Sequence, residues 1–159
     1  MIKLVWAVLC EKVITDQQTG QTSFVNCIET IGATKFPVVL QAFSLGTRWH
    51  FDTESEFIGK LRLILFCPDK SERLIMTSDV HTGRANNHRI LFALNGIRLD
   101  KPGHYVLGLQ RKSDHGWTSA QEIPFDAALV TLEGKTKTLK KRTRTAPDKI
   151  RREYPCAGS

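Results

Sequence analysis

The sequence lacks the short motifs that mark the common classes of enzyme. It contains no GxxxxGKS/T phosphate-binding loop, no GxGxxG turn, no HExxH helix and no GxSxG nucleophile elbow. Each of these motifs places backbone amides, metal ligands or a nucleophile for a defined reaction. Their absence excludes the most common motif-bearing enzymes, so we predict no catalytic residue, no cofactor and a function other than catalysis.

The sequence has no CxxC spacing among its four cysteines, which are Cys10, Cys27, Cys67 and Cys156. A chain of 159 residues can build a core without disulfides, so the cysteines indicate a reducing, cytoplasmic location. If residues 16–21 form a symmetric loop, Thr15 faces Thr22 and the same register places Cys10 opposite Cys27. We interpret this pair as two reduced, buried thiols, with a disulfide as the alternative.

Long hydrophobic runs are also missing. The apolar stretch of residues 4–10 superficially resembles a secretory leader, but Glu11 and Lys12 follow at once and no small-residue cleavage site appears. The run is far too short to span a bilayer, which needs about 20 apolar residues. We therefore predict a buried first strand and no membrane partner.

No segment has a sustained 3.6-residue hydrophobic period, whereas short segments alternate apolar and polar residues between turns. This pattern predicts an all-β fold, an Ig-like antiparallel β-sandwich of seven to nine strands over residues 1–133. Leu61, Leu63 and Leu65 should face the core while Lys60 and Arg62 meet water. The expected strands cover residues 2–15, 23–31, 38–51, 60–65, 73–78, 90–94, 104–109 and 117–125, with a turn at 68–71 and a polar loop at 79–87.

Two sequence features carry resemblances to known proteins. The entry Pro102-Gly103-His104-Tyr105 is similar to one that is frequent in Ig-like sandwiches. Together with the hairpin segments 7–11 and 23–29 and with Phe36-Pro37, it resembles a family of small bacterial proteins of unknown function over roughly residues 4–125. The resemblance implies a β-rich fold and assigns no catalytic residue.

The net charge of +7 lies entirely in the last 26 residues. Residues 1–133 hold 14 Lys plus Arg and 14 Asp plus Glu, whereas residues 134–159 hold 9 and 2. We predict that this tail is extended or partly helical and forms the binding site. Its basic residues are Lys135, Lys137, Lys140, Lys141, Arg142, Arg144, Lys149, Arg151 and Arg152.

A metal site is the weakest of the hypotheses. Asp79, His81 and His88 could form a two-histidine, one-carboxylate centre across the predicted loop, but nothing in their spacing requires it. We interpret the segment as a polar surface loop and expect no metal. A metal-dependent hydrolase remains a third hypothesis, which would require stoichiometric metal in the purified protein.

The leading prediction is therefore a non-enzymatic binding or assembly module whose basic tail docks on an acidic protein partner, which could belong to a larger assembly. The alternative is a nucleic-acid-associated protein whose tail contacts phosphates. A stacking platform for bases would need aromatic residues interleaved with basic ones on an exposed strand. Arg48-Trp49 is the nearest approximation in the sequence.

Overall fold

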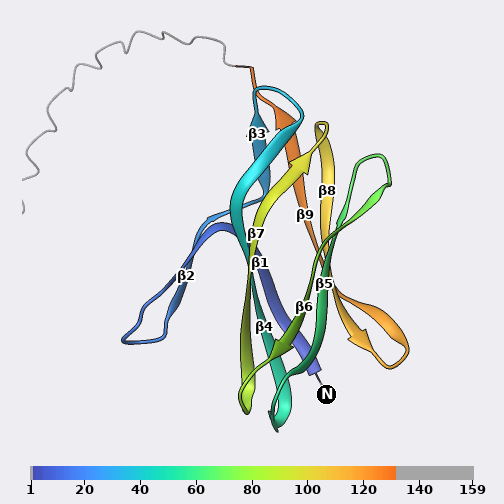
Figure 1. The fold of residues 1–159 in the computed structure, drawn as a ribbon. Helices are drawn as coiled ribbons and strands as arrows, with labels where there is room; N and C mark the ends of the chain where they lie inside the picture. Colours follow the sequence, from blue (N-terminus) through green and yellow to red (C-terminus); the bar gives the residue numbers. More distant parts are fainter. Residues whose placement is uncertain (1, 132–159) are drawn as a thin grey trace, which may run out of the picture.

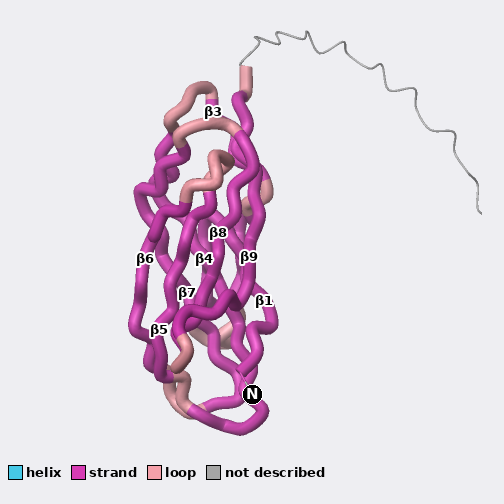
Figure 2. Tube along the Cα trace, turned by 90° about the vertical axis from the view of Figure 1, so that its right-hand side faces the viewer, coloured by secondary structure: helices cyan, strands magenta, loops and turns pink. Residues whose placement is uncertain are grey.

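The computed structural model describes residues 2–131, which form nine strands in two facing sheets (Figure 1). The all-β, sandwich-like architecture confirms the prediction at this level, and no helix among the described residues could span a membrane. Figure 2 shows the strands running along the long axis of the domain. The strands are β1 (Ile2–Thr15), β2 (Thr22–Cys27), β3 (Thr30–Ala33), β4 (Val38–Ser55), β5 (Ile58–Phe66), β6 (Glu72–His81), β7 (Ala85–Leu99), β8 (Gly103–Ser113) and β9 (Gly116–Leu129).

One sheet has the strand order β2-β1-β4-β7 and the other β3-β9-β8-β5-β6. Every pairing of the described strands is antiparallel except β3 with β9, which is parallel. The expectation of a wholly antiparallel sandwich was therefore wrong at this edge. The return strand expected over residues 23–31 is split, because the chain bends after Asn26, whose φ is 54°, and crosses from one sheet to the other before β3.

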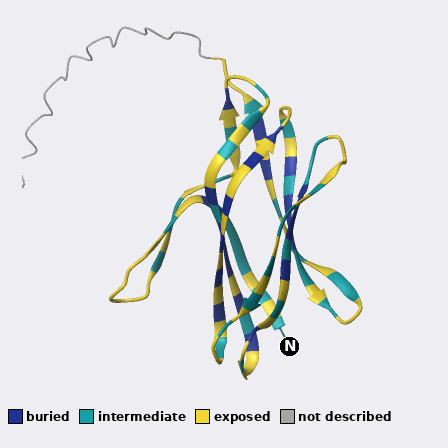
Figure 3. Cartoon of the chain, in the orientation of Figure 1, coloured by how far each residue is buried: buried dark blue, intermediate teal, exposed yellow. Residues whose placement is uncertain are grey.

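The core lies between the sheets and follows the predicted alternation. Leu61, Leu63 and Leu65 of β5 are at most 1% exposed, whereas Lys60 is exposed and Arg62 is half-buried on the other face. Tyr105 and Leu107 of β8 are equally buried. Figure 3 shows such buried positions alternating with exposed ones along the strands. Burying each large apolar side chain contributes about 1.5–3 kcal/mol, so this alternation fixes the inner face of each strand.

The polar loop expected over residues 79–87 is mostly strand. β6 continues to His81 and β7 begins at Ala85, which leaves residues 82–84 as the connection. Polar side chains dominate the segment because alternate positions of both strands face solvent, so composition alone resembled a loop. β7 also continues through Gly96, whose φ is 69°, to Leu99, whereas the predicted strand ended at residue 94.

The first hairpin has the predicted register, with Thr15 opposite Thr22 and Cys10 opposite Cys27. Its loop is closed by Asp16, whose Oδ1 accepts hydrogen bonds from the amides of Gln18 and Thr19, both at 2.8 Å. Farther along β2, the ring of Phe24 lies so close to Gly46 of β4 that a side chain at Gly46 would overlap it. The hairpin therefore curls over the outer face of the four-stranded sheet.

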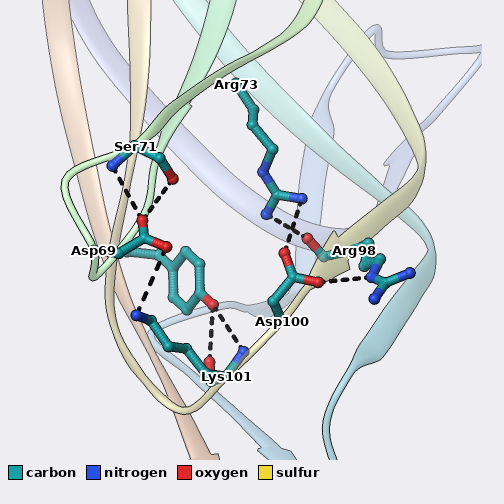
Figure 4. Close-up of polar contacts among 7 residues, drawn as sticks. Asp69, Ser71, Arg73, Arg98, Asp100 and Lys101 are labelled. Carbon is teal, nitrogen blue, oxygen red and sulfur yellow. Dashed lines mark hydrogen bonds and ion pairs between the residues drawn. The ribbon is translucent and has the colours of Figure 1, made fainter.

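Two turns meet at one end of the sandwich, where a polar cluster joins them (Figure 4). Asp69, in the predicted turn of residues 68–71, accepts hydrogen bonds from Ser71 and lies 3.6 Å from Nζ of Lys101 in the β7–β8 turn. Arg73 of β6 contacts Asp100 at 3.4 Å and donates to the carbonyl of Arg98 at 2.6 Å. The cluster holds the β5–β6 turn against the end of β7.

Candidate docking surface

The first third of β4 has a strand partner on one side only. β7 pairs with β4 from Val38 onward, but β1 pairs with β4 only from Phe51 back to Ser44. Beyond Cys10, β1 leaves β4 and continues with β2 alone. In the part of the chain that the structure describes, residues 38–43 therefore present a free sheet edge, on which every second residue points its amide and carbonyl outward.

A groove of about 420 Å³ lies along this edge. Its second wall is β3, which pairs with β9 and has no other strand neighbour among the described residues. The groove is open to solvent and is lined by residues 30–32 of β3, residues 39–43 of β4, Glu11 and Ile28. The groove thus lies between β3 of one sheet and the unpaired edge of β4 in the other sheet.

The side chains of the groove are mainly apolar. Phe43 is only 5% exposed and belongs to the core, against which Ile31 and Leu40 are partly buried, while Val39 is 44% exposed. Glu11 is the one charged side chain of the lining, and its carboxylate accepts a hydrogen bond from Asn26 Nδ2 at 2.7 Å. Besides Glu11, the polar side chains of the lining are Thr30 and Gln41.

The described chain ends beside this groove. The amide of Val130 donates to the carbonyl of Ala33 at 2.8 Å, and a side chain on Gly32 would come within 2.7 Å of Val130 Cγ2. The basic residues predicted to form the binding site follow in the sequence, and all nine lie outside the described residues. The structure therefore places Val130 beside β3, the second wall of the groove.

The candidate metal ligands do not come together. Asp79 lies 3.3 Å from Lys60 Nζ, and His81 lies 3.5 Å from Glu56, both on the surface. His88 is 5% exposed and uses both ring nitrogens, Nδ1 with Thr82 Oγ1 at 2.7 Å and Nε2 with the carbonyls of Ser55 and Ala85, both at 2.9 Å. Residues 2–131 contain no group of three potential ligands around a common point.

A basic and aromatic cluster lies on the five-stranded sheet, where the sequence did not reveal it. The guanidinium of Arg62 is 4.4 Å from the ring centre of Trp117, and Nζ of Lys112 is 5.6 Å from it. The register aligns Arg62 with Gln110, and Gln110 Oε1 accepts from Arg62 Nε at 2.7 Å. Because Arg62, Lys112 and Trp117 come from β5, β8 and β9, strand pairing brings the three residues together.

The pair Arg48-Trp49, which the sequence suggested for stacking, cannot serve that purpose. Trp49 is 2% exposed and its indole donates to Thr47 Oγ1 at 3.1 Å, so the ring is a core residue. The expectation for the first cysteine pair was also wrong in part. Cys10 and Cys27 are free thiols, but only Cys10 is buried; Cys27 is exposed because it lies on the outermost strand β2.

Several solved structures match this chain at low sequence identity and with TM-scores below 0.5. A β-glucosidase from Listeria innocua in complex with glucose has a TM-score of 0.46 and 7% identity over 80% of this chain. A β-glucosidase from Erythrobacter marinus has a TM-score of 0.48 and 11% identity over 80% of this chain. The chain spans only 16% and 15% of those two enzymes, so no activity is inferred from them.

The C-terminal domain of Wzt has a TM-score of 0.44 and 12% identity, covering 82% of this chain and 75% of that domain. A comparison with curated proteins finds none that matches. Residues 5–136 match the model of DUF6941, a family of unknown function. This match includes the hairpin and the Pro102-Gly103-His104-Tyr105 entry, and it confirms the resemblance to a family without a known activity.

Proposed function

Starting from the fact that the chain belongs to the DUF6941 family of unknown function, we propose that it is a non-enzymatic binding or assembly module that docks on a protein partner. The observation that carries this proposal is the unpaired edge of β4 over residues 38–43, with its groove. An extended segment of the partner adds to this edge as a further strand. The backbone hydrogen bonds of that strand supply affinity, and its alternate side chains meet the groove.

The length and chemistry of the edge suit this mode of binding. Six residues of β4 lack a strand on the β1 side, which matches the length of a common strand. Val39, Leu40 and Ile31 offer apolar contact area, and burying it stabilises the complex by about 25 cal/mol per Å² before the cost of ordering the peptide. The nine basic residues that follow in the sequence favour an acidic partner segment, since opposite charges raise the rate of encounter.

We include in this proposal a cytoplasmic location and an Ig-like classification. The cytoplasmic location is supported by the free thiols of Cys10 and Cys27, because thiols stay reduced in a reducing compartment. The Ig-like assignment is supported by the hydroxyl of Tyr105, which bonds back to the chain four residues upstream, as in the tyrosine corner of Ig-like sandwiches.

The test selects ligands for the full-length chain from a library of random linear peptides and locates each ligand by amide hydrogen exchange. We expect alternate amides of residues 38–43 to gain protection. Val39→Lys, which places a charge on the exposed rim of the groove, should weaken binding by about tenfold or more, equal to about 1.4 kcal/mol. Leu91→Lys is the matched control, because Leu91 has the same 44% exposure on β7.

Two results would contradict the proposal. In the first, the selected peptides protect the amides of another surface, such as β6. In the second, Val39→Lys and Leu91→Lys lower the affinity equally. Removal of residues 134–159 provides a further comparison: acidic ligands should lose affinity and salt dependence on truncation, while neutral ligands should keep both.

A second candidate function, association with single-stranded nucleic acid, is favoured by the cluster of Arg62, Lys112 and Trp117. An aromatic ring flanked by cations is the arrangement on which bases stack and phosphates bind. The test is retention of the full-length chain and of residues 1–133 on nucleic-acid and acidic-protein columns across a salt gradient. This would become the leading function if the chain is retained on the nucleic-acid column alone, if Trp117→Ala abolishes that retention, and if the control Trp6→Phe keeps it.

A further inference from the structure

Cys10 and Cys27 stand directly opposite each other on β1 and β2. The amide of Ile28 donates to the carbonyl of Leu9 at 2.8 Å. This bond joins the residue after Cys27 to the residue before Cys10, so the two cysteines themselves form a non-hydrogen-bonded pair. In such a pair the Cα atoms are about 4.5 Å apart and the side chains are closest. That separation lies within the range of about 4.4–6.8 Å that a disulfide can bridge.

The two thiols differ in accessibility. Cys10 is 0% exposed, and its Sγ is 3.4 Å from the carbonyl of Lys12 and 3.7 Å from that of Ser44. Burial raises the pKa of the Cys10 thiol above its usual value, and a negative charge on Cys27 raises this pKa further. Cys27 is exposed on the outer strand. An oxidant in solution therefore reaches Cys27 and not Cys10.

We propose that Cys10 and Cys27 form a modification site that undergoes thiol–disulfide exchange with a small disulfide such as oxidised glutathione. The Cys27 thiolate attacks one sulfur of the glutathione disulfide, forming a mixed disulfide and releasing one glutathione thiolate. Cys10, after losing its proton to solvent, attacks Cys27 Sγ and displaces the second glutathione thiolate. The two protein thiols are oxidised to one disulfide, while the small disulfide is reduced to two glutathione molecules after proton uptake.

The order of attack follows from the geometry. Cys27 is the entry point because it is accessible, and Cys10 is the resolving thiol because it stands opposite Cys27 and is buried from a disulfide in solution. Cys67 lies at the end of β5 in the other sheet, where its amide bonds to Ser71 in the β5–β6 turn. It is therefore no competitor for Cys27 within one folded chain.

The modification acts beside the groove but does not depend on the docking proposal. Glu11 follows Cys10, Ile28 follows Cys27, and both line the groove. The disulfide would thus fasten the hairpin at the point where β1 leaves β4. Because both thiols can be titrated in the absence of any partner, the test of this site is separate from the test of strand addition.

The test uses the full-length chain with Cys67→Ser and Cys156→Ser, so that the pair is isolated. After incubation with mixtures of reduced and oxidised glutathione, we expect loss of both thiols, a mass lower by two hydrogens and a cross-linked peptide joining Cys10 to Cys27. In the same background, Cys10→Ala should accumulate one glutathione on Cys27. Cys27→Ala should remain unmodified because Cys10 is buried.

Circular dichroism of each variant establishes that it is folded, and the full wild-type chain is oxidised in parallel so that the proposal does not depend on the variants. Three outcomes would overturn it: a glutathione adduct on Cys27 that persists although Cys10 is present, a wild-type disulfide that joins other cysteines, or both thiols remaining free at every ratio of the two glutathione forms.

Discussion

The hydroxyl of Tyr105 donates a hydrogen bond to the backbone carbonyl of Lys101, 2.8 Å away, across the turn that joins β7 to β8. The ring of Tyr105 is 1% exposed and stacks on Phe125, with the ring centres 5.6 Å apart. A single side chain therefore anchors the turn to the core. Through Lys101 and Asp69, the same turn is held against the β5–β6 turn.

Tyr105→Phe should destabilise the domain while keeping its fold. The substitution retains the buried ring but removes the hydrogen bond to the Lys101 carbonyl in an exposed turn, at a cost of about 0.5–1.5 kcal/mol. The midpoint of urea unfolding measures the change at constant slope. Lys101→Ala is the control, because it keeps the carbonyl and removes only a surface ion pair worth about 0–1 kcal/mol. Equal losses in the two variants would contradict this account.

Asp69 should make stability depend on pH in the acid range. Hydrogen bonds from the hydroxyl and the amide of Ser71 lower the pKa of Asp69, with Lys101 adding to the effect. Because the folded-state pKa lies below the unfolded value, the contribution is fully present above the unfolded pKa of about 4 and is lost as the pH falls through the folded pKa.

The measurement is the melting temperature of the wild type, Asp69→Asn and Ser71→Ala between neutral and acid pH. Wild type should exceed Asp69→Asn near neutrality, and the difference should shrink as the pH falls. Ser71→Ala should lie between them, since it keeps the amide donor at 3.0 Å. A difference that stays constant over the whole range would show that the charge of Asp69 is not involved.

The sequence predicted the parts of the fold that depend on local pattern. The alternation at Leu61, Leu63 and Leu65 and the register of the first hairpin are properties of neighbouring residues, so periodicity and loop symmetry were sufficient. The crossing of the chain to β3 was not predictable in this way. The crossing depends on which sheet offers a free edge. The segment of residues 23–31 contains apolar residues both before and after the break between β2 and β3, so its composition did not reveal the break.

The candidate docking surface required the same long-range information. The free edge exists because β1 parts from β4 at Cys10, whereas residues 38–43 look like any other strand in the sequence. Trp117 and Arg62 are far apart in the chain and meet only through the register of β5, β8 and β9. The predicted basic sites could be read from composition, but their positions lie outside the described residues.

Gly46 should tolerate no side chain without movement of the Phe24 ring. A methyl group there would overlap the ring of Phe24, so Gly46→Ala should cost about 1–3 kcal/mol through overpacking. Chemical denaturation measures this loss. In a Phe24→Leu background the same substitution should cost less, because the smaller side chain leaves room for the methyl group. Additive losses in the double variant would show that the two positions do not interact.

Oxidation of Cys10 and Cys27 should stabilise the chain against unfolding. The disulfide would close a loop of residues 10–27, and closing a loop of about 15 residues removes entropy from the unfolded chain equivalent to about 3 kcal/mol, less any strain in the folded state. Unfolding in urea without reductant should therefore show a higher midpoint for the oxidised chain. The control is Cys27→Ala, whose midpoint should not respond to oxidant. A lower midpoint for the oxidised wild type would mean that strain at the closely spaced pair exceeds the entropic gain, and oxidation would then loosen the hairpin beside the groove rather than fasten it.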